Sequence, residues 1–332
     1  MAKFNGQDTP KLNITVRDLS GGANSRQAAN NILPNQATLL YNVDISVPGE
    51  TRRRPGIDLI EDLSNDAGTG AFGFEPAGGT NELLVTHGTK LEGWTGSGTF
   101  TEHKIDFSSG LATTIIKAGE SGENDVALIS NGTNEVFRMK QNHTFQGLGD
   151  TNTSPPLTTV MTYYRNRVWA LKDNGLYYAD AFPADYSVAF DRTSNYFGVP
   201  VGEEMGIVGI RDAGLVAIGK DAIYSLNPSL TPAATDRPEK VLDIGCLAAN
   251  TVQLVGDDIW FFAKDGLRGM FRTQLDKMQS GTSFPLSYLL KDNYDDIRWA
   301  RIQYACGMYY DNKYFLSITT GNSNYNNQVW IF

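Results

Sequence analysis

The sequence predicts an all-β fold, a β-propeller of about six blades with an extended N-terminal arm. Three observations predict it: a repeat of about 44 residues, turn residues inside each repeat, and a polar segment before the first repeat. Repeats of this length are typical of propellers, whose blades each hold four short strands. We expect an assembly arm over residues 1–60 and a propeller over residues 61–332, with the last blade incomplete.

The arm comes first and has little hydrophobic periodicity. Ser20–Ala23 predicts a flexible turn, and Asn35–Tyr41, directly after Pro34, has the pattern of a short helix. Three consecutive arginines at residues 52–54 then fall in a loop or strand edge bounded by proline and glycine. Arginines can contact phosphate, but the acidic chain favours a solvated edge or contacts with carboxylates of a neighbouring subunit.

The propeller follows from a pattern of an apolar strand, a polar or glycine turn, and a second short strand. Its six copies cover Glu82–Trp94, Asp125–Phe137, Arg167–Tyr178, Gly214–Ser225, Asp258–Gly269 and Lys313–Thr320. The first strand of each copy is almost continuously apolar, which is typical of a strand covered on both faces. The turn residues tolerate positive φ, so each copy is expected to be a hairpin.

Two alternatives stay open for these strands: a β-sandwich or barrel with strands at similar intervals, and a β-rich chain that does not close. The wider last interval contains residues 280–290 and 292–299, which predict an insertion with a helical turn or two between blades. The chain stops in a strand-like run, Asn327–Phe332. An exposed apolar strand favours aggregation, so either another segment pairs with it or the natural protein continues, and we favour the second.

Charge and composition disfavour several classes of function. The formal charge of −9 and the pI near 4.9 argue against a domain that grips nucleic acid by its phosphates. Cys246 and Cys306 fit neither a metal spacing nor a disulfide framework, so we expect them to be reduced, buried and unreactive. The sequence has no signal-peptide pattern and no apolar run of membrane length, and we expect a soluble protein made in a cytoplasm.

The residues give no pattern of catalysis, and we expect no enzyme activity, no cofactor and no metal. His87, His103 and His143 lack a Cys, His or carboxylate partner at a metal-ligand spacing. The G-x-G-x-x-G match at residues 68–73 leads into a strand pattern rather than a helix, so it does not predict a dinucleotide site. Adjacent carboxylates, as at residues 203–204, point to opposite faces of a strand. A hydrolase built from distant carboxylates at the mouth of the propeller is the remaining enzymatic alternative.

Several stretches share a pattern with a known family. They are Asp18–Asn24, Ile32–Ala37, Tyr41–Asp44 and Arg53–Gly56 near the start, and Gly202–Ile210, Gly214–Tyr224, Gly245–Val252 and Ile259–Leu267 later. Together they resemble the tail nozzle, tail hub and DNA-stabilisation proteins of short-tailed bacteriophages, from about residue 18 to the end. The candidate assembly residues are Asp18, Asn24, Arg26, Pro34, Asn35, Gln36, Asn42, Arg52, Arg53 and Arg54.

The resemblance implies a virion structural protein at the tail or the head–tail junction, made in the host cytoplasm. Copies of it would form a ring, usually a hexamer, below the portal, extend the DNA channel and help retain the packaged genome. Portal, adaptor or other tail proteins would be partners, and DNA would only pass through; an acidic wall suits this because it repels phosphate. The alternative is a tail propeller that binds a host-surface glycan or protein through aromatics such as Trp94, although such aromatics more often fill blade interfaces.

Overall fold

A computed structural model describes residues 19–29, 31–45, 47, 50–54, 63, 68–104, 106–108, 111–210 and 214–332. Contacts divide the chain into two units. One holds the described residues up to Arg54 together with Ser287–Asp296, and the other holds the described residues from 63 to 286 and from 297 to 332. The described residues of the predicted assembly arm lie in the first unit. Ser287–Asp296, which the sequence places within the propeller range, belongs to the first unit as well.

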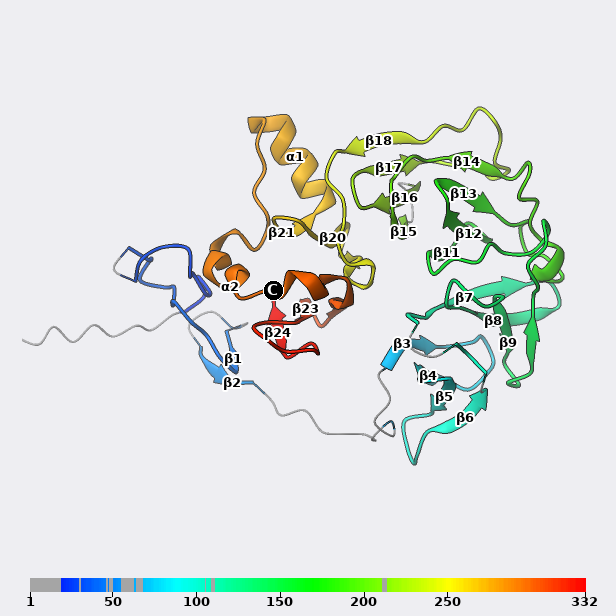
Figure 1. Cartoon of the computed structure of the whole chain (residues 1–332), viewed down its shortest axis with the longest axis horizontal. Coiled ribbons are helices and arrows are strands. Elements are labelled where there is room, and N and C mark those ends of the chain that lie inside the picture. The colour runs from blue at the N-terminus through cyan, green and yellow to red at the C-terminus, as the bar shows by residue number, and fades with distance from the viewer. Residues whose placement is uncertain are drawn as a thin grey trace, which may run out of the picture. The chain divides into compact units, whose positions relative to one another are not determined.

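The second unit is a six-bladed β-propeller, six small antiparallel sheets that follow one another around a ring (Figure 1). Its strands are β3 (Gly68–Phe74), β4 (Glu82–His87), β5 (Lys90–Trp94), β6 (Thr101–Lys104), β7 (Thr114–Glu120), β8 (Glu123–Ser130), β9 (Phe137–Lys140), β10 (Phe145–Gly147), β11 (Met161–Tyr164), β12 (Arg167–Lys172), β13 (Gly175–Tyr178), β14 (Tyr196–Gly198), β15 (Glu204–Ile210), β16 (Gly214–Gly219), β17 (Ile223–Leu226), β18 (Glu239–Leu242), β19 (Gln253–Val255), β20 (Asp258–Ala263), β21 (Gly266–Gly269), β22 (Cys306–Tyr310), β23 (Lys313–Ile318) and β24 (Gln328–Ile331). The first four sheets have four strands each, and the last two have three among the described residues. The predicted propeller is confirmed.

The predicted hairpins form the middle of their sheets. In the fourth blade, for example, β16 and β17 come from Gly214–Ser225, and all six residues of β16 are buried. Covering on both faces explains why these strands are continuously apolar. In the third blade, Asp173 and Asn174 at the β12–β13 turn have φ of 50° and 59°, as a tight hairpin with two left-handed residues requires.

Each blade buries its faces against its neighbours. The first strand of one sheet contacts the first strand of the next, as β3 does with β7, β7 with β11 and β11 with β15, so these strands lie on the inner side of the ring. Apolar clusters fill the space between successive sheets of the first five blades. Leu84 and Ile129 share the cluster between the first two blades, and Ile218 and Phe261 share the one between the fourth and fifth. The stability of the ring therefore comes from contacts between blades.

Short helices interrupt the strands. They are the α-helices α1 (Met270–Ser280) and α2 (Lys291–Asp295) and the 3-10 helices η1 (Tyr186–Val188), η2 (Ala249–Thr251), η3 (Tyr288–Leu290) and η4 (Trp299–Tyr304). A helical insertion between the last two blades is present, but its main helix α1 begins ten residues before the predicted stretch. None of the helices in the described ranges is long and apolar enough to cross a membrane.

The final run, Asn327–Phe332, contributes β24, which pairs with β23 so that Ile331 lies opposite Phe315. In the first unit, β1 (Val43–Asp44) pairs with β2 (Arg52–Arg53). The short helix predicted over residues 35–41 is absent. Ala37 instead bridges Ala23, and its amide donates to the Gly22 oxygen, so the backbone group that a helix would use is already engaged.

Candidate functional site

Three side chains from two blades meet at one point. Glu82 is the first residue of β4 and His103 lies in β6, both in the first blade. His143 lies in the turn between β9 and β10 of the second blade, with a φ of 60°. Residue 143 adopts a left-handed backbone conformation in this turn. Its imidazole faces Glu82 of the neighbouring blade. The packing of the two blades therefore creates the cluster.

Glu82 joins the two imidazoles. Its Oε2 lies 2.8 Å from Nε2 of His103, and its Oε1 lies 2.8 Å from Nε2 of His143. The two rings stack with centroids 4.0 Å apart and planes 16° from parallel. The side chains of Glu82 and His103 are 3% and 7% exposed, whereas that of His143 is 40% exposed. Two members of the cluster are therefore fixed by burial, and the third reaches solvent.

The electrostatics of the cluster favour an ionised carboxylate. Burial acts to raise the pKa of Glu82, but hydrogen bonds and charge from His103 and His143 outweigh it, and the net pKa is lowered. Glu82 is thus an anion almost out of contact with water, and it depends on its two partners for stabilisation.

A glycine makes room for this arrangement. Gly93 lies on β5, the strand between β4 and β6. A Cβ at this position would overlap with Oε2 of Glu82 and Nε2 of His103. The absence of a side chain at Gly93 is therefore what allows a carboxylate and an imidazole to meet across an intervening strand.

The cluster offers ligands that transition metals use. The ligand atoms of Glu82, His103 and His143 all lie within 4.8 Å of one another. Two imidazoles with one carboxylate is a donor set found in zinc sites that keep an open position. The three histidines have no partner at a metal-ligand spacing in the sequence, but each has a carboxylate partner in space, and that of His87 is Glu92 at 3.0 Å. Sequence spacing missed these contacts because they depend on strand pairing and blade packing.

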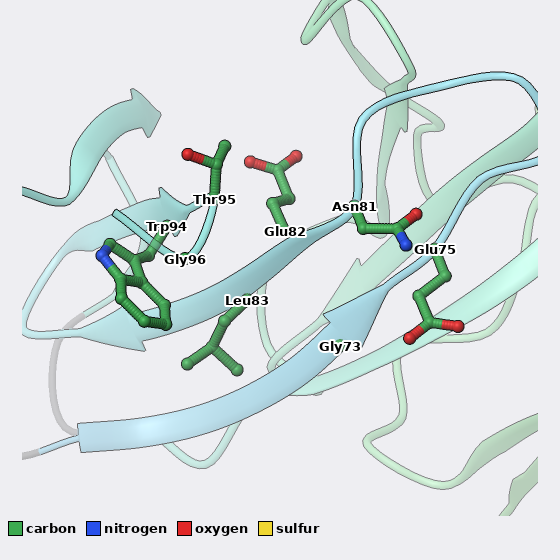
Figure 2. A pocket seen from close by; sticks show the side chains of 8 residues that line it. All are labelled: Gly73, Glu75, Asn81, Glu82, Leu83, Trp94, Thr95 and Gly96. Atoms are coloured by element: carbon green, nitrogen blue, oxygen red, sulfur yellow. The ribbon is translucent and has the colours of Figure 1, made fainter. Parts of the chain in front are cut away.

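A surface hollow of about 260 Å³ adjoins Glu82 (Figure 2). Its lining residues are Gly73, Glu75, Asn81, Glu82, Leu83, Trp94, Thr95 and Gly96. Leu83 and Trp94 are direct cross-strand partners on β4 and β5, and the Trp94 indole donates to the Gly98 oxygen at 3.0 Å. The hollow thus combines an aromatic ring with carboxylate and amide groups.

The predicted assembly residues lie in the first unit, and several maintain its local fold. Asn24 is buried, and its Nδ2 donates to Oε1 of Gln36 at 2.8 Å. The same Gln36 oxygen accepts from the Leu33 amide at 3.2 Å, which closes the turn that contains Pro34 and Asn35. These residues form a small hydrogen-bonded cluster. Its hydrogen bonds hold the turn in place without the helix that the sequence predicted over residues 35–41.

Arg26 attaches this turn to the later segment of the same unit. Its amide donates to the Leu289 oxygen at 3.1 Å, and its guanidinium lies 3.6 Å from the centre of the Tyr288 ring. A cation over an aromatic face is stabilised by the negative potential of the ring. Arg26 therefore explains in part why Ser287–Asp296 belongs to this unit.

The arginines lie along β2 and just after it. Arg52 pairs with Glu50 at 2.6 Å, Arg53 is exposed and opposite Val43, and the Arg54 amide donates to the oxygen of Asn42. The predicted assembly residues form two local groups rather than one site, the first around Asn24 and the second around Asn42. Asp18 lies outside the described residues.

No protein-family model matches the sequence, and no curated protein matches it. Solved structures match at low identity. Two extracellular domains from B. thetaiotaomicron, described as parts of hybrid two component systems, are each 12% identical, with TM-scores of 0.46 and 0.43. The matches cover 81% and 63% of this chain but only 34% and 27% of those chains. A catalytically inactive virginiamycin B lyase from Staphylococcus aureus is 11% identical, with a TM-score of 0.37, over 78% of this chain and 94% of that one.

Proposed function

We propose that this chain is a structural protein of a phage tail, in which copies of it form a ring below the portal. The ring would extend the DNA channel and help retain the packaged genome. The observation that carries the proposal is the separate first unit. The early stretches that resemble nozzle and hub proteins contribute to this unit, and their side chains hold its local fold, as Asn24 and Gln36 do. A unit whose local fold is already held by its own hydrogen bonds suits assembly, since little order has to be gained on binding.

The net charge favours the wall of a channel through which DNA passes, rather than a surface that binds DNA. The chain carries a net charge of −9, and Arg52 is already paired with Glu50. Such a surface repels phosphate and lets DNA slide. The proposed partners are other copies of the chain, in a hexamer, and portal, adaptor or other tail proteins. The proposed place is the virion tail or head–tail junction, the site of synthesis is the host cytoplasm, and the role requires no catalysis.

Antibody-gold labelling of purified particles tests the proposed place. Gold at the vertex where tail meets head, or along the short tail, would support a nozzle or hub role. Gold at fibre tips would favour host recognition instead. Particles without any label would overturn the proposal.

A charge reversal tests whether the first unit mediates ring formation. Arg53 is exposed on β2, and Arg53→Glu should lower the fraction of purified protein in a ring, as measured by mass photometry. Lys264→Glu makes the same charge change at an exposed turn of the propeller and serves as the matched control. Equal loss in both variants would mean that net charge, and not the first unit, controls assembly.

The hollow beside Trp94 favours host-surface binding as the second candidate function. The hollow is lined by the Trp94 ring and also by Glu75 and Asn81, which together provide the stacking and hydrogen-bonding groups that a sugar needs (Figure 2). Under this alternative, the isolated chain would bind host polysaccharide in a titration, and Trp94→Ala would abolish that binding. A failure of the wild-type chain to bind would remove the alternative.

A further inference from the structure

We infer that Glu82, His103 and His143 form a binding site for a divalent transition-metal ion of the zinc type. The inference stands apart from the proposed tail role, since it rests only on the geometry of the first two blades. Within the described residues, this is the only group of three such side chains whose ligand atoms all lie within 4.8 Å of one another.

The donor set selects the kind of ion. Imidazole nitrogen suits Zn²⁺ and its neighbours in the first transition row, whereas Ca²⁺ and Mg²⁺ take oxygen ligands in larger numbers. Two of the three donors here are imidazole nitrogens, and the atoms that face Glu82 are the Nε2 atoms of His103 and His143. The cluster therefore favours Zn²⁺ over Ca²⁺ or Mg²⁺.

The distances require only a small expansion. Ligands about 2.1 Å from a tetrahedral Zn²⁺ lie about 3.4 Å from one another. The two Glu82–imidazole distances are 2.8 Å, so each has to widen by about 0.6 Å. The near-parallel stacking of the rings also requires one of them to turn before both lone pairs point at the ion. His143 is the ring that is free to do so, because it is 40% exposed in a turn while Glu82 and His103 are fixed by burial.

Binding also changes the proton positions. In the hydrogen-bonded cluster, an imidazole that donates to Glu82 carries its proton on Nε2. A coordinating Nε2 must present its lone pair, so a neutral ring that carries its proton on Nε2 has to exchange it with solvent for one on Nδ1, and a ring protonated on both nitrogens releases its Nε2 proton to solvent. The ionised state of Glu82 needs no change.

The ion would connect two blades. Glu82 and His103 belong to the first blade and His143 belongs to the turn between β9 and β10 of the second. Coordination links the two blades through the ion, with two bonds to the first blade and one to the second, across a boundary that otherwise depends on apolar packing and hydrogen bonds. Three protein ligands leave the fourth position of a tetrahedral site open to water.

Titration of the full chain with ZnCl₂ by calorimetry, after chelator treatment and dialysis, tests the site. We expect one Zn²⁺ per chain and no binding of Ca²⁺. Two variants each remove one ligand: His143→Asn, which tolerates the positive φ, and Glu82→Gln, which keeps the side-chain shape. Loss of an outer-shell partner of a metal costs about 10–100-fold in affinity, so loss of a ligand should weaken Zn²⁺ binding by more than about tenfold. Glu102→Gln alters the exposed carboxylate next to His103 and is the matched control, with unchanged affinity expected.

A second readout keeps the test valid if a variant folds poorly. In the wild-type chain, Zn²⁺ should shift the imidazole ¹⁵N resonances of His103 and His143 and leave those of His87 unchanged. The absence of Zn²⁺ binding to the wild-type chain would overturn the inference. So would full affinity in His143→Asn, or shifts confined to His87.

Discussion

The Tyr314 hydroxyl donates a 2.6 Å hydrogen bond to the backbone oxygen of Thr251. Tyr314 lies on β23 of the sixth blade, and Thr251 lies in η2, directly before the fifth. Both residues are fully buried, and the Tyr314 ring packs against Trp260 with centroids 5.5 Å apart. Burial raises the pKa of the Tyr314 hydroxyl, so it keeps its proton at neutral pH and remains a donor. The contact is therefore a fixed polar link between two blades.

Removing this hydroxyl should destabilise the propeller. Tyr314→Phe leaves the Thr251 oxygen buried without that donor, which costs about 1–3 kcal/mol of unfolding free energy. Urea unfolding followed by tryptophan fluorescence measures the change. Tyr310→Phe removes a hydroxyl from a side chain that is 66% exposed and should leave stability unchanged. Equal effects of the two substitutions would contradict a special role for Tyr314.

The space at Gly93 should be essential to the Glu82 cluster. Gly93→Ala places a methyl group onto Glu82 and His103, and overpacking of this kind costs about 1–3 kcal/mol. The control is Gly73→Ala on β3, where a Cβ meets no atom within 4 Å. Thermal unfolding of both variants measures the difference. A Gly93→Ala protein as stable as the control would show that the carboxylate and the imidazole do not need that space.

The two thiols should differ in reactivity. Cys246 is buried, its Sγ lies 3.1 Å from the Ala248 oxygen, and burial raises its pKa to about 11. Cys306 is exposed on β22, so the expectation that both cysteines are buried is wrong for Cys306. A disulfide reagent such as DTNB should label one thiol per native chain and two after unfolding in guanidinium. Labelling should disappear from native Cys306→Ser and persist in native Cys246→Ser, and any other pattern would contradict this assignment.

Helix α1 should depend on a carboxylate from a distant strand. Its N-cap is Gly269, which has no side-chain cap. Instead Oδ1 of Asp258, on β20, accepts from the Phe271 amide at 2.8 Å, and Oδ2 accepts from the Arg272 amide at 3.4 Å. Loss of a cap costs about 0.5–2 kcal/mol, so Asp258→Ala should destabilise by that amount and lower the helical signal in circular dichroism. Asp276→Ala, which removes the exposed pair with Arg272, should cost less.

The six blades were predictable because their information is local. Apolar strands such as β16 and turns such as Asp173–Asn174 can be recognised from a sequence window of about ten residues. The propeller order then follows, because each hairpin packs against the next in the chain. The start of α1 was not predictable, because its cap comes from Asp258 on another strand and not from the residue before the helix.

The Glu82 cluster could not be predicted either, because it also depends on contacts between residues of different strands. His103 and His143 are 21 and 61 residues from Glu82, distances that fit no local metal motif. His103 reaches Glu82 across β5, whose pairing with β6 contains a register shift, and His143 reaches it from the second blade. Only Gly93 gave a hint, since a glycine inside a strand often marks the close approach of other atoms.

The pKa of Asp191 gives a stability prediction at low pH. Its Oδ1 accepts from the hydroxyl of Thr193 at 2.7 Å and from the amides of Thr193 and Ser194, and its Oδ2 accepts from the Ser194 hydroxyl at 2.9 Å. These hydrogen bonds lower the pKa of Asp191 from its ordinary value of 3.8 to about 2. Because the folded pKa lies below the unfolded one, the stabilisation is complete above the unfolded pKa and is lost as the pH falls from about 4 towards 2. Side-chain ¹³C shifts should therefore give a titration midpoint near 2 for Asp191 in the native chain, and the double change Thr193→Val with Ser194→Ala should return it towards 3.8. A native midpoint already near 3.8 would show that these hydrogen bonds do not hold the loop in solution.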